Sequence, residues 1–306
     1  MSWTAADIPN QIGRIAVVTG ANGGLGFETA LALARHGAHV VMAARNPEKT
    51  ARAVARIRAD VPSAELDVVR LDLGSQDSVR SAADQILADH PRLDLLVNNA
   101  GVMATPEQKT VDGFEMQFGV DHLGHWSLTA LLLPALLGTA RIVTVTSTAH
   151  HIGRAVDPAN PHLIGRYRPW RAYGQAKLAN FHFGIGLQHK LRSAGRTTAS
   201  LVAHPGLCNT ELQTVSVQET NGGASQRFFE VLAQRTGMSP ADGARSQLRA
   251  AVDPNARGGE FYGPLFVNSG PPVRKPIFRL GMESAIARLW EVSARETGIP
   301  LEVGAG

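Results

Sequence analysis

A tyrosine and a lysine stand four residues apart at the start of an expected helix, in the segment Tyr173-Gly-Gln-Ala-Lys177. Residues separated by four positions lie on the same helical face. An ammonium group beside a phenol stabilises the phenolate and lowers the tyrosine pKa from its ordinary value of about 10. Such a tyrosine can act as a general acid or base near neutral pH. The pair alone is common, so its meaning depends on accompanying residues. Ser147, which follows a strand-like run, is one of them, because its hydroxyl can hydrogen-bond the oxygen of an alcohol or carbonyl substrate.

A glycine-rich segment, Gly20-Ala-Asn-Gly-Gly24-Leu-Gly26, lies between the first strand-like run and the first expected helix. Small residues let the backbone approach a pyrophosphate closely, and the free N–H groups at a helix start attract an anion. The spacing is G-x-x-x-G-x-G and differs from the general dinucleotide fingerprint. This segment therefore predicts a phosphate site, although a tight strand–helix connection without a ligand remains the alternative on this motif alone.

The second strand-like run ends at Arg45 and has no carboxylate there. A carboxylate at this position would accept hydrogen bonds from the adenosine ribose of NAD, whereas an arginine pairs with a 2′-phosphate. We therefore expect NADP(H) to be preferred over NAD(H); the alternative is an ordinary surface arginine. Asp72, after the third run, is a candidate acceptor for the adenine amino group or else a turn residue.

Short apolar runs alternate with amphipathic stretches along the chain. We expect strands at 15–19, 39–44, 67–71, 93–97, 141–146 and 197–203, and helices at 25–36, 47–59, 75–89, 111–137 and 173–191. Several runs are continuously apolar, which is typical of strands buried on both faces of a parallel sheet. The alternation predicts one α/β domain over residues 1–306, a Rossmann fold with a doubly wound parallel sheet flanked by helices. Segments 149–171 and about 207–237 fit this pattern poorly. We interpret them as a loop insertion and a mobile substrate cover.

The composition excludes several classes of protein. With 44% hydrophobic and 18% charged residues, the 306-residue chain is globular and not disordered. Its single cysteine, Cys208, rules out an internal disulfide and favours a reducing compartment. The net charge of +4 is spread along the chain, so we expect no nucleic-acid binding. The most apolar stretch, 128–137, is too short to cross a bilayer, and no signal peptide is visible. We expect a soluble, cytoplasmic protein without a membrane anchor.

Four histidines are candidate metal ligands: His122, His125, His150 and His151. The first two share a helical face. No H-E-x-x-H motif or cysteine ligand set accompanies them, so we expect no metal.

Taken in chain order, the motifs resemble those of the short-chain dehydrogenase/reductase family over residues 14–210. The matching pieces are Thr19-Gly-Ala-Asn-Gly-Gly-Leu-Gly26, Asp72-Leu73, Asn98-Asn-Ala-Gly101, Ser147, Tyr173-x-x-x-Lys177 and Pro205-Gly206 with Thr210. Further details resemble the retinol-dehydrogenase-like branch: Phe118-Gly-Val-Asp-His-Leu-Gly-His125, Ala149-His-His151 and Tyr173-Gly-Gln-Ala-Lys-Leu-Ala-Asn180. The spacing of 26 residues from Ser147 to Tyr173 also fits that branch, and the insertion 149–171 accounts for it.

This resemblance implies an oxidoreductase that transfers a hydride between NADP(H) and an apolar alcohol or its carbonyl counterpart. It implies Tyr173 as general acid/base, Lys177 as the residue that holds the nicotinamide ribose, and Ser147 as the residue that orients the substrate oxygen. The cofactor-binding residues implied are Tyr173, Lys177, Gly20, Asn22, Gly24, Leu25, Gly26, Arg45, Asp72, Leu73, Asn99, Ala100, Gly101, Pro205, Gly206 and Thr210. In the family, the helices matching 111–137 and 173–191 often pair in dimers, which implies a homo-oligomer. A non-catalytic module that senses NADP(H) is the alternative function.

Asp121 departs from the family pattern, which has asparagine at this position. In the family that residue helps bend the long helix and holds a water that links the lysine to solvent. An ionised aspartate only accepts hydrogen bonds, and its charge would stabilise the Lys177 ammonium while opposing a Tyr173 phenolate. We include Asp121 among the catalytic residues and expect a working site with a shifted pH dependence. Cys208, where a small aliphatic residue is usual, is interpreted as a packing residue.

Overall fold

The computed structural model describes residues 2–136, 138–208 and 237–304. An eight-stranded sheet forms its centre, in the order β3-β2-β1-β4-β5-β6-β7-β8. The strands are β1 Ile15–Thr19, β2 His39–Ala44, β3 Leu66–Arg70, β4 Leu95–Asn98, β5 Arg141–Val145, β6 Ala199–Ala203, β7 Phe261–Pro264 and β8 Pro272–Lys275. Neighbours from β3 to β7 pair in parallel, and β8 pairs antiparallel with β7. The chain order reverses between β1 and β4, which is where doubly wound sheets bind their ligands.

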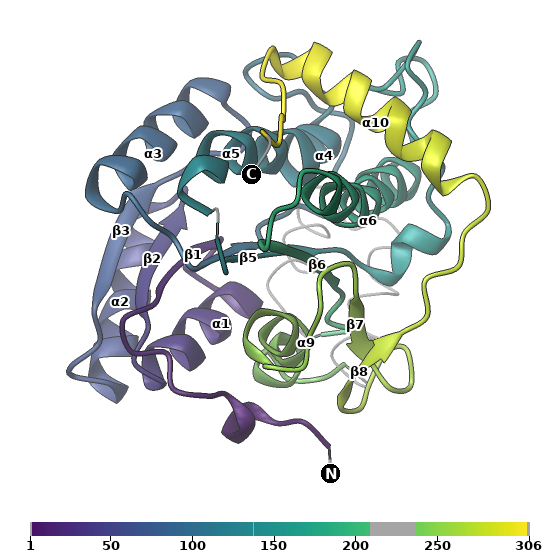
Figure 1. The fold of residues 1–306 in the computed structure, drawn as a ribbon. Coiled ribbons are helices and arrows are strands. Elements are labelled where there is room, and N and C mark those ends of the chain that lie inside the picture. The colour runs from purple at the N-terminus through teal and green to yellow at the C-terminus, as the bar shows by residue number, and fades with distance from the viewer. Residues whose placement is uncertain (1, 137, 209–236, 305–306) are drawn as a thin grey trace.

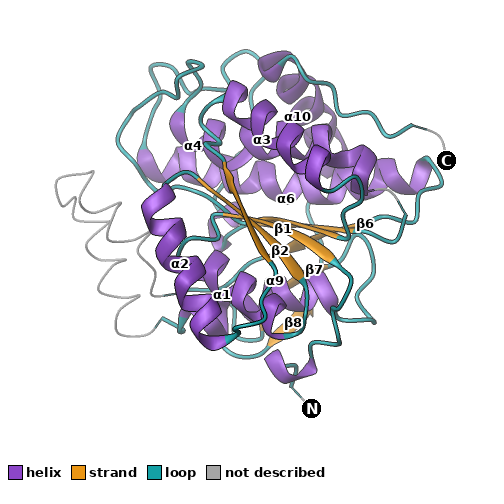
Figure 2. Ribbon diagram, turned by 90° about the vertical axis from the view of Figure 1, so that its left-hand side faces the viewer, coloured by secondary structure: helices purple, strands orange, loops and turns teal. Residues whose placement is uncertain are grey.

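Helices cover both faces of this sheet (Figures 1 and 2). One face carries α3 Gln76–Asp89, α5 Gly124–Leu132, α6 Pro169–Ser193 and α10 Met282–Thr297. The other carries α1 Gly24–Arg35, α2 Pro47–Asp60 and α9 Pro240–Val252. The doubly wound α/β fold expected from the sequence is therefore confirmed.

Alternate residues of each strand serve two separate cores. On β1, Val17 packs into the core beneath α3 and α6, whereas Ala16 and Val18 pack into the core beneath α1 and α9. Side chains of a strand point alternately to opposite faces, so a strand buried on both faces is apolar throughout. This burial explains why the strand-like runs contain few polar residues.

The expected long helix over 111–137 is wrong at its start. Residues 111–115 form a turn and an isolated bridge, and α4 Met116–Phe118 begins only after Glu115. The Glu115 carboxylate caps this helix by accepting hydrogen bonds from the N–H groups of Gln117 and Phe118, at 2.8 and 2.7 Å. A π-helical turn, Gly119–Leu123, then joins α4 to α5.

Helix α6 begins at Pro169, four residues before the expected start. Proline suits the first turn of a helix because it lacks the N–H group that would remain unpaired there. The strands β7 and β8 and the helices α9 and α10 were not assigned from the sequence.

The segment 149–171 consists mostly of turns and packs against the body of the protein. Val156 and Leu163 are buried. The Tyr167 hydroxyl donates to the carbonyl oxygen of Thr105 at 2.7 Å, and the Gln175 side chain donates to that of Pro161 at 2.7 Å. Within the described residues, every helix is too short or too polar to cross a bilayer.

The expected cover over 207–237 lies outside the described residues except at its two ends. Cys208 is buried and its backbone pairs with that of Met238. Burial raises the pKa of its thiol to about 12. These features agree with the packing role expected for this cysteine.

Candidate active site

The predicted site residues gather at one edge of the sheet because parallel strands all end on the same side. Each of the first six strands is followed by at least one of them. In strand order they are Gly20, Arg45, Asp72, Asn99, Ser147 and Pro205.

The glycine-rich turn after β1 has the geometry of a phosphate cradle. Gly20 and Gly24 have φ angles of 67° and 50°, which side chains rarely permit. A Cβ atom on Gly26 would overlap the Gly20 carbonyl oxygen and come within 2.6 Å of Asn99 Nδ2. Gly23 gives the first turn of α1 no side-chain cap, so its N–H groups are available to an anion. The residues therefore fit the pyrophosphate of a dinucleotide.

A network of buried polar groups fixes the loop after β4 against this turn. The Thr19 hydroxyl oxygen accepts from the N–H groups of Asn99 and Ala100, at 2.9 and 3.0 Å. Asn99 donates its side-chain amide to the Thr19 carbonyl oxygen at 2.9 Å. The loop that precedes Gly101 is thereby held beside the phosphate cradle.

His125 connects that network to the helix that carries Asp121. Its Nδ1 lies 2.9 Å from the Asp121 carbonyl oxygen, which can only accept, so Nδ1 carries the proton. Its Nε2 lies 2.9 Å from the Thr19 hydroxyl and therefore accepts from it. Burial lowers the pKa of His125 to about 4, which keeps the ring neutral. From the sequence, His125 was a candidate metal ligand and part of the branch motif, but it had no predicted contact in the site. The four-residue spacing from Asp121 was the available signal for this contact.

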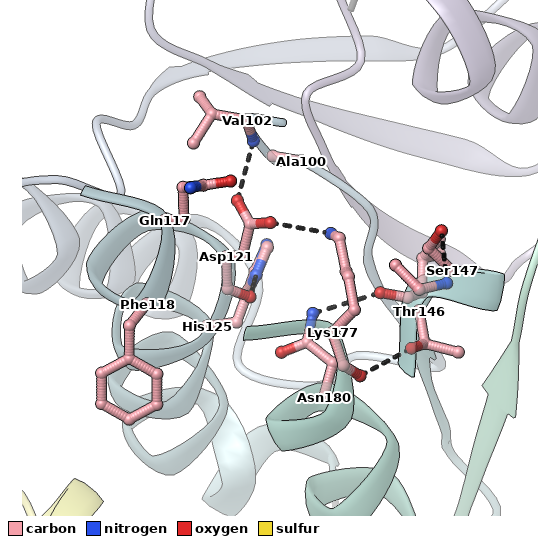
Figure 3. Close-up of polar contacts among 12 residues, drawn as sticks. Ala100, Val102, Gln117, Phe118, Asp121, His125, Thr146, Ser147, Lys177 and Asn180 are labelled. Carbon is pink, nitrogen blue, oxygen red and sulfur yellow. Dashed lines mark hydrogen bonds and ion pairs between the residues drawn. The ribbon is translucent and has the colours of Figure 1, made fainter. Parts of the chain in front are cut away.

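Asp121 forms a buried ion pair with Lys177 (Figure 3), with 3.0 Å between Oδ2 and Nζ. Its other oxygen accepts from the Val102 N–H at 2.7 Å. A Cβ atom on Gly101 would lie 3.0 Å from the lysine Nζ, so a glycine here leaves room for the pair. The Asp121 carboxylate therefore contacts the lysine directly.

The charges of this pair reinforce each other. Burial lowers the pKa of Lys177, but the Asp121 carboxylate and Tyr173 together raise it more, so the ammonium is retained. Burial raises the pKa of Asp121 by more than Lys177 and the Val102 N–H lower it.

Tyr173 is buried one turn before Lys177, whose Nζ lies 5.5 Å from the centre of its ring. Burial raises the tyrosine pKa most. Lys177 and a hydrogen bond with Ser147 lower it, whereas Asp121 raises it. The net shift is upward. The expected lowering of the pKa by Lys177 is present, but the effect of burial is larger and the Asp121 carboxylate adds to it.

Two hydrogen bonds fasten α6 to the end of β5 and so bring Ser147 to the tyrosine. The Thr146 hydroxyl donates to the Lys177 carbonyl oxygen at 2.6 Å, and the Asn180 amide donates to the Val145 carbonyl oxygen at 3.2 Å (Figure 3). The candidate site therefore combines residues that follow β5 with residues of α6 and of the π-helical turn.

The remaining predicted residues lie around this centre, with individual differences. Arg45 is exposed after β2. Asp72 accepts from the Gly74 N–H at 2.9 Å, which is the turn role left open above. Leu73 is a buried core residue, and Gly206 adopts a φ of 79°. Asn22 and Leu25 belong to the glycine-rich turn and the start of α1, and Thr210 lies outside the described residues.

A glycine-rich turn at the switch point of a doubly wound sheet, beside a tyrosine–lysine pair, is typical of nicotinamide-dependent dehydrogenases. A family model described as short chain dehydrogenase matches residues 14–221. The chain belongs to the short-chain dehydrogenase/reductase family and is an NAD(P)-dependent oxidoreductase that acts on CH–OH groups.

Two similar mouse proteins carry names from the branch expected above. Mouse polyprenol dehydrogenase is 38% identical over 299 residues, which cover 95% of this chain and 86% of the relative. Mouse retinol dehydrogenase 11 is 38% identical over 292 residues, covering 95% and 88%. The retinol-dehydrogenase-like resemblance is confirmed.

Solved structures show the same fold. A crystal structure of a putative uncharacterized protein from Mycobacterium paratuberculosis is 39% identical, with a TM-score of 0.80. The match covers 99% of this chain and 100% of that chain. A short chain dehydrogenase/reductase from Burkholderia phymatum in complex with NAD is 26% identical, with a TM-score of 0.63 and coverage of 79% and 86%. A putative NAD(P) dependent gluconate 5-dehydrogenase from Beutenbergia cavernae with bound NADP is 25% identical, with a TM-score of 0.64 and coverage of 83% and 96%. A nicotinamide cofactor is therefore supported.

Proposed function

We propose that the protein is an NADP(H)-dependent oxidoreductase that interconverts an apolar alcohol and its carbonyl counterpart, with Tyr173 as the acid/base. The observation that carries this proposal is the grouping of the buried Tyr173 and Lys177 with the half-buried Ser147, at the edge of the sheet that holds the glycine-rich turn. The chemistry supplied by the bound nicotinamide is hydride transfer, and the protein must supply position and a proton.

Each residue then has one task during carbonyl reduction. The Ser147 hydroxyl donates a hydrogen bond to the substrate oxygen and orients it. The Tyr173 hydroxyl transfers its proton to that oxygen as negative charge develops on it. The Lys177 ammonium stabilises the resulting phenolate, and its remaining N–H groups would hold the nicotinamide ribose. Asp121 anchors the ammonium at 3.0 Å. In alcohol oxidation the proton moves in the opposite direction.

The preference for NADP(H) rests on Arg45, which is exposed at the end of β2 and can reach a 2′-phosphate. We expect Arg45→Ala to weaken NADPH binding by about 10- to 100-fold, the usual value of a charge-assisted hydrogen bond. NADH binding should change by less than about threefold, because NADH has no 2′-phosphate. Fluorescence titration with both cofactors measures this. Arg58→Ala, at an exposed site in the last turn of α2, is the matched control. Equal losses for NADPH and NADH would contradict the assignment.

The proposed substrate class rests on the names of the relatives, which refer to polyprenol and retinol. We propose that segments 149–171 and 207–237 border the substrate. NADPH consumption with aldehydes of increasing chain length, and with sugars for contrast, tests the proposal. Faster turnover of the sugars would contradict it. The cytoplasmic location and the homo-oligomer stay predictions.

Asp121 should set the pH at which the tyrosine works. We expect Asp121→Asn to retain the fold, because its amide oxygen can still accept from the Val102 N–H. Removing a negative charge near the phenol favours the phenolate, so the pH profile of alcohol oxidation should move down by about one unit. The profile of kcat/KM measures this shift, and the thermal unfolding midpoint reports on the fold. An unchanged profile would show that the carboxylate does not influence Tyr173.

A further inference from the structure

Two histidines and an aspartate converge at the end of the sheet opposite the active site. His39 is the first residue of β2, Asp67 is the second residue of β3, and His90 caps the end of α3. Two positions farther along the same strands, Val41 and Val69 pack into the core beneath α3. Because side chains alternate along a strand, His39 and Asp67 lie on that same face. Three elements thus meet at this cluster.

Both histidines point their ε-nitrogens at one carboxylate oxygen. Asp67 Oδ2 lies 2.7 Å from His39 Nε2 and 2.8 Å from His90 Nε2, and the three atoms lie within 4.8 Å of one another. The two rings stand nearly perpendicular, at 82°. The side chains of His90, His39 and Asp67 are 10%, 26% and 44% exposed. The cluster is therefore held by the protein on one side and open to solvent on the other.

A second carboxylate completes the surroundings. Glu65 Oε2 lies 3.6 Å from His39 Nδ1. If a neutral His39 donates from Nε2 to Asp67, its Nδ1 presents a lone pair to Glu65, which is unfavourable. Among the described residues, neither Glu65 nor Asp67 forms an ion pair with a lysine or arginine. With neutral histidines the cluster carries two uncompensated negative charges. A cation at the ε-nitrogens would compensate these charges. It would also move the proton of His39 to Nδ1, where it faces Glu65.

We propose that His39, Asp67 and His90 form a binding site for a divalent transition-metal ion, with Zn²⁺ as the best fit. Two imidazoles and one carboxylate are ligands that zinc accepts, and water supplies the fourth position. Magnesium and calcium prefer oxygen ligands, so the imidazoles select against them. In a tetrahedral site the ligand atoms lie about 3.3 Å apart, which requires each to move by less than about 1 Å. Glu65 then accepts a hydrogen bond from His39 Nδ1–H, the usual support of a metal-bound histidine.

Metal binding displaces the protons from the ε-nitrogens of the two histidines. A histidine binds the metal as a neutral ring, so the proton at Nε2 moves to Nδ1 or, from a doubly protonated ring, to solvent. Binding should therefore weaken as the pH falls, because protons compete with the metal for the ring nitrogens. The metal would join the starts of β2 and β3 to the end of α3. Its effect should be on stability and not on turnover, because the catalytic edge lies at the opposite ends of the strands.

Titration of the untagged protein with Zn²⁺ in a calorimeter tests this site. We expect one ion per chain, and a thermal midpoint about 5 °C higher at 100 times the dissociation constant. His90→Gln and Asp67→Asn should each weaken binding by at least about 100-fold, and Glu65→Gln by about 10-fold. His39→Gln, at a more exposed position, gives the same test if the buried His90 variant does not fold.

His189→Gln is the matched control, because it removes an exposed histidine from α6. It should bind Zn²⁺ as the original protein does. Co²⁺ should give visible absorption bands of four-coordination in the original protein and not in the Asp67 variant. Zinc binding that is equally strong in the Asp67 and His39 variants would overturn the proposal, as would the lack of a saturable site. NADPH turnover should remain unchanged in all of these variants, which separates this test from that of the proposed function.

Discussion

Replacing Tyr173 with phenylalanine should lower kcat for carbonyl reduction by about 100- to 10,000-fold, the range that general acid/base catalysis contributes. The variant retains the buried ring but has no proton to give to the substrate oxygen. Lys177 stays paired with Asp121, so the groups expected at the cofactor ribose remain in place. The dissociation constant of NADPH should therefore change by less than about threefold, since a lost acid acts on chemistry and not on binding.

Tyr262→Phe is the control for this experiment. This variant also removes the hydroxyl of a buried tyrosine. Tyr262 lies on β7, and its hydroxyl donates a hydrogen bond to the Glu260 carboxylate at 2.7 Å. We expect this variant to lower stability and to leave kcat unchanged. Steady-state kinetics and a fluorescence titration with NADPH measure both effects. The proposed role of Tyr173 is refuted if its variant keeps the original kcat, or if NADPH binding is lost together with turnover.

The second large effect is a loss of stability at acidic pH. Burial lowers the pKa of five histidines below the ordinary value of 6.5, to about 3 for two of them and about 4 for three. They are His122, His204, His125, His150 and His182. In the unfolded chain these rings bind protons below a pH of about 6.5, whereas in the folded chain they stay neutral. Glu115 offsets about one of these protons, because burial raises its pKa to about 7 and it already holds a proton in the folded chain at pH 5. Unfolding therefore takes up about four protons near pH 5, and the free energy of unfolding should fall there by about 5 kcal/mol for each unit by which the pH is lowered.

Because a folded protein is stable by only about 5–15 kcal/mol, this slope predicts unfolding near pH 5. Urea titrations between pH 7.5 and 5, followed by tryptophan fluorescence, measure the slope. His182→Phe should reduce it by about one proton, since the buried Nε2 of His182 has no hydrogen-bond partner among the described residues. His189→Gln, on the same helix but exposed, should leave the slope unchanged. A stability that is constant over this range would show that the buried rings are not kept neutral.

The sheet could be predicted because its strands are buried on both faces. Residues Ile15–Thr19 form an apolar run with a clear beginning and end, and β1 occupies those residues. The last two strands were missed because β7 and β8 are short and contain proline and glycine, which are poor strand signals. For α9 a signal was present. Ser239 caps the helix and Pro240 begins it, but the neighbouring unpatterned segment obscured this start.

The chemistry of the site was less accessible than its location. Tyr173, Lys177 and Ser147 were found because their spacing and order are informative by themselves. The direct contact of Asp121 with Lys177 links residues far apart in the chain and depends on a π-helical turn that has no local sequence rule. The upward pKa shift of Tyr173 depends on burial, which only the complete packing determines.

The π-helical turn Gly119–Leu123 constrains the number of residues in this part of the helix. A π turn contains one residue more than an α turn of the same span, and this one lies between two contacts with other parts of the chain. Before it, Gln117 accepts from the Ala104 N–H at 2.7 Å; after it, His125 meets Thr19. Deleting one residue would rotate one of these side chains away by about 100°. The helix therefore tolerates substitutions here more readily than a change in its number of residues.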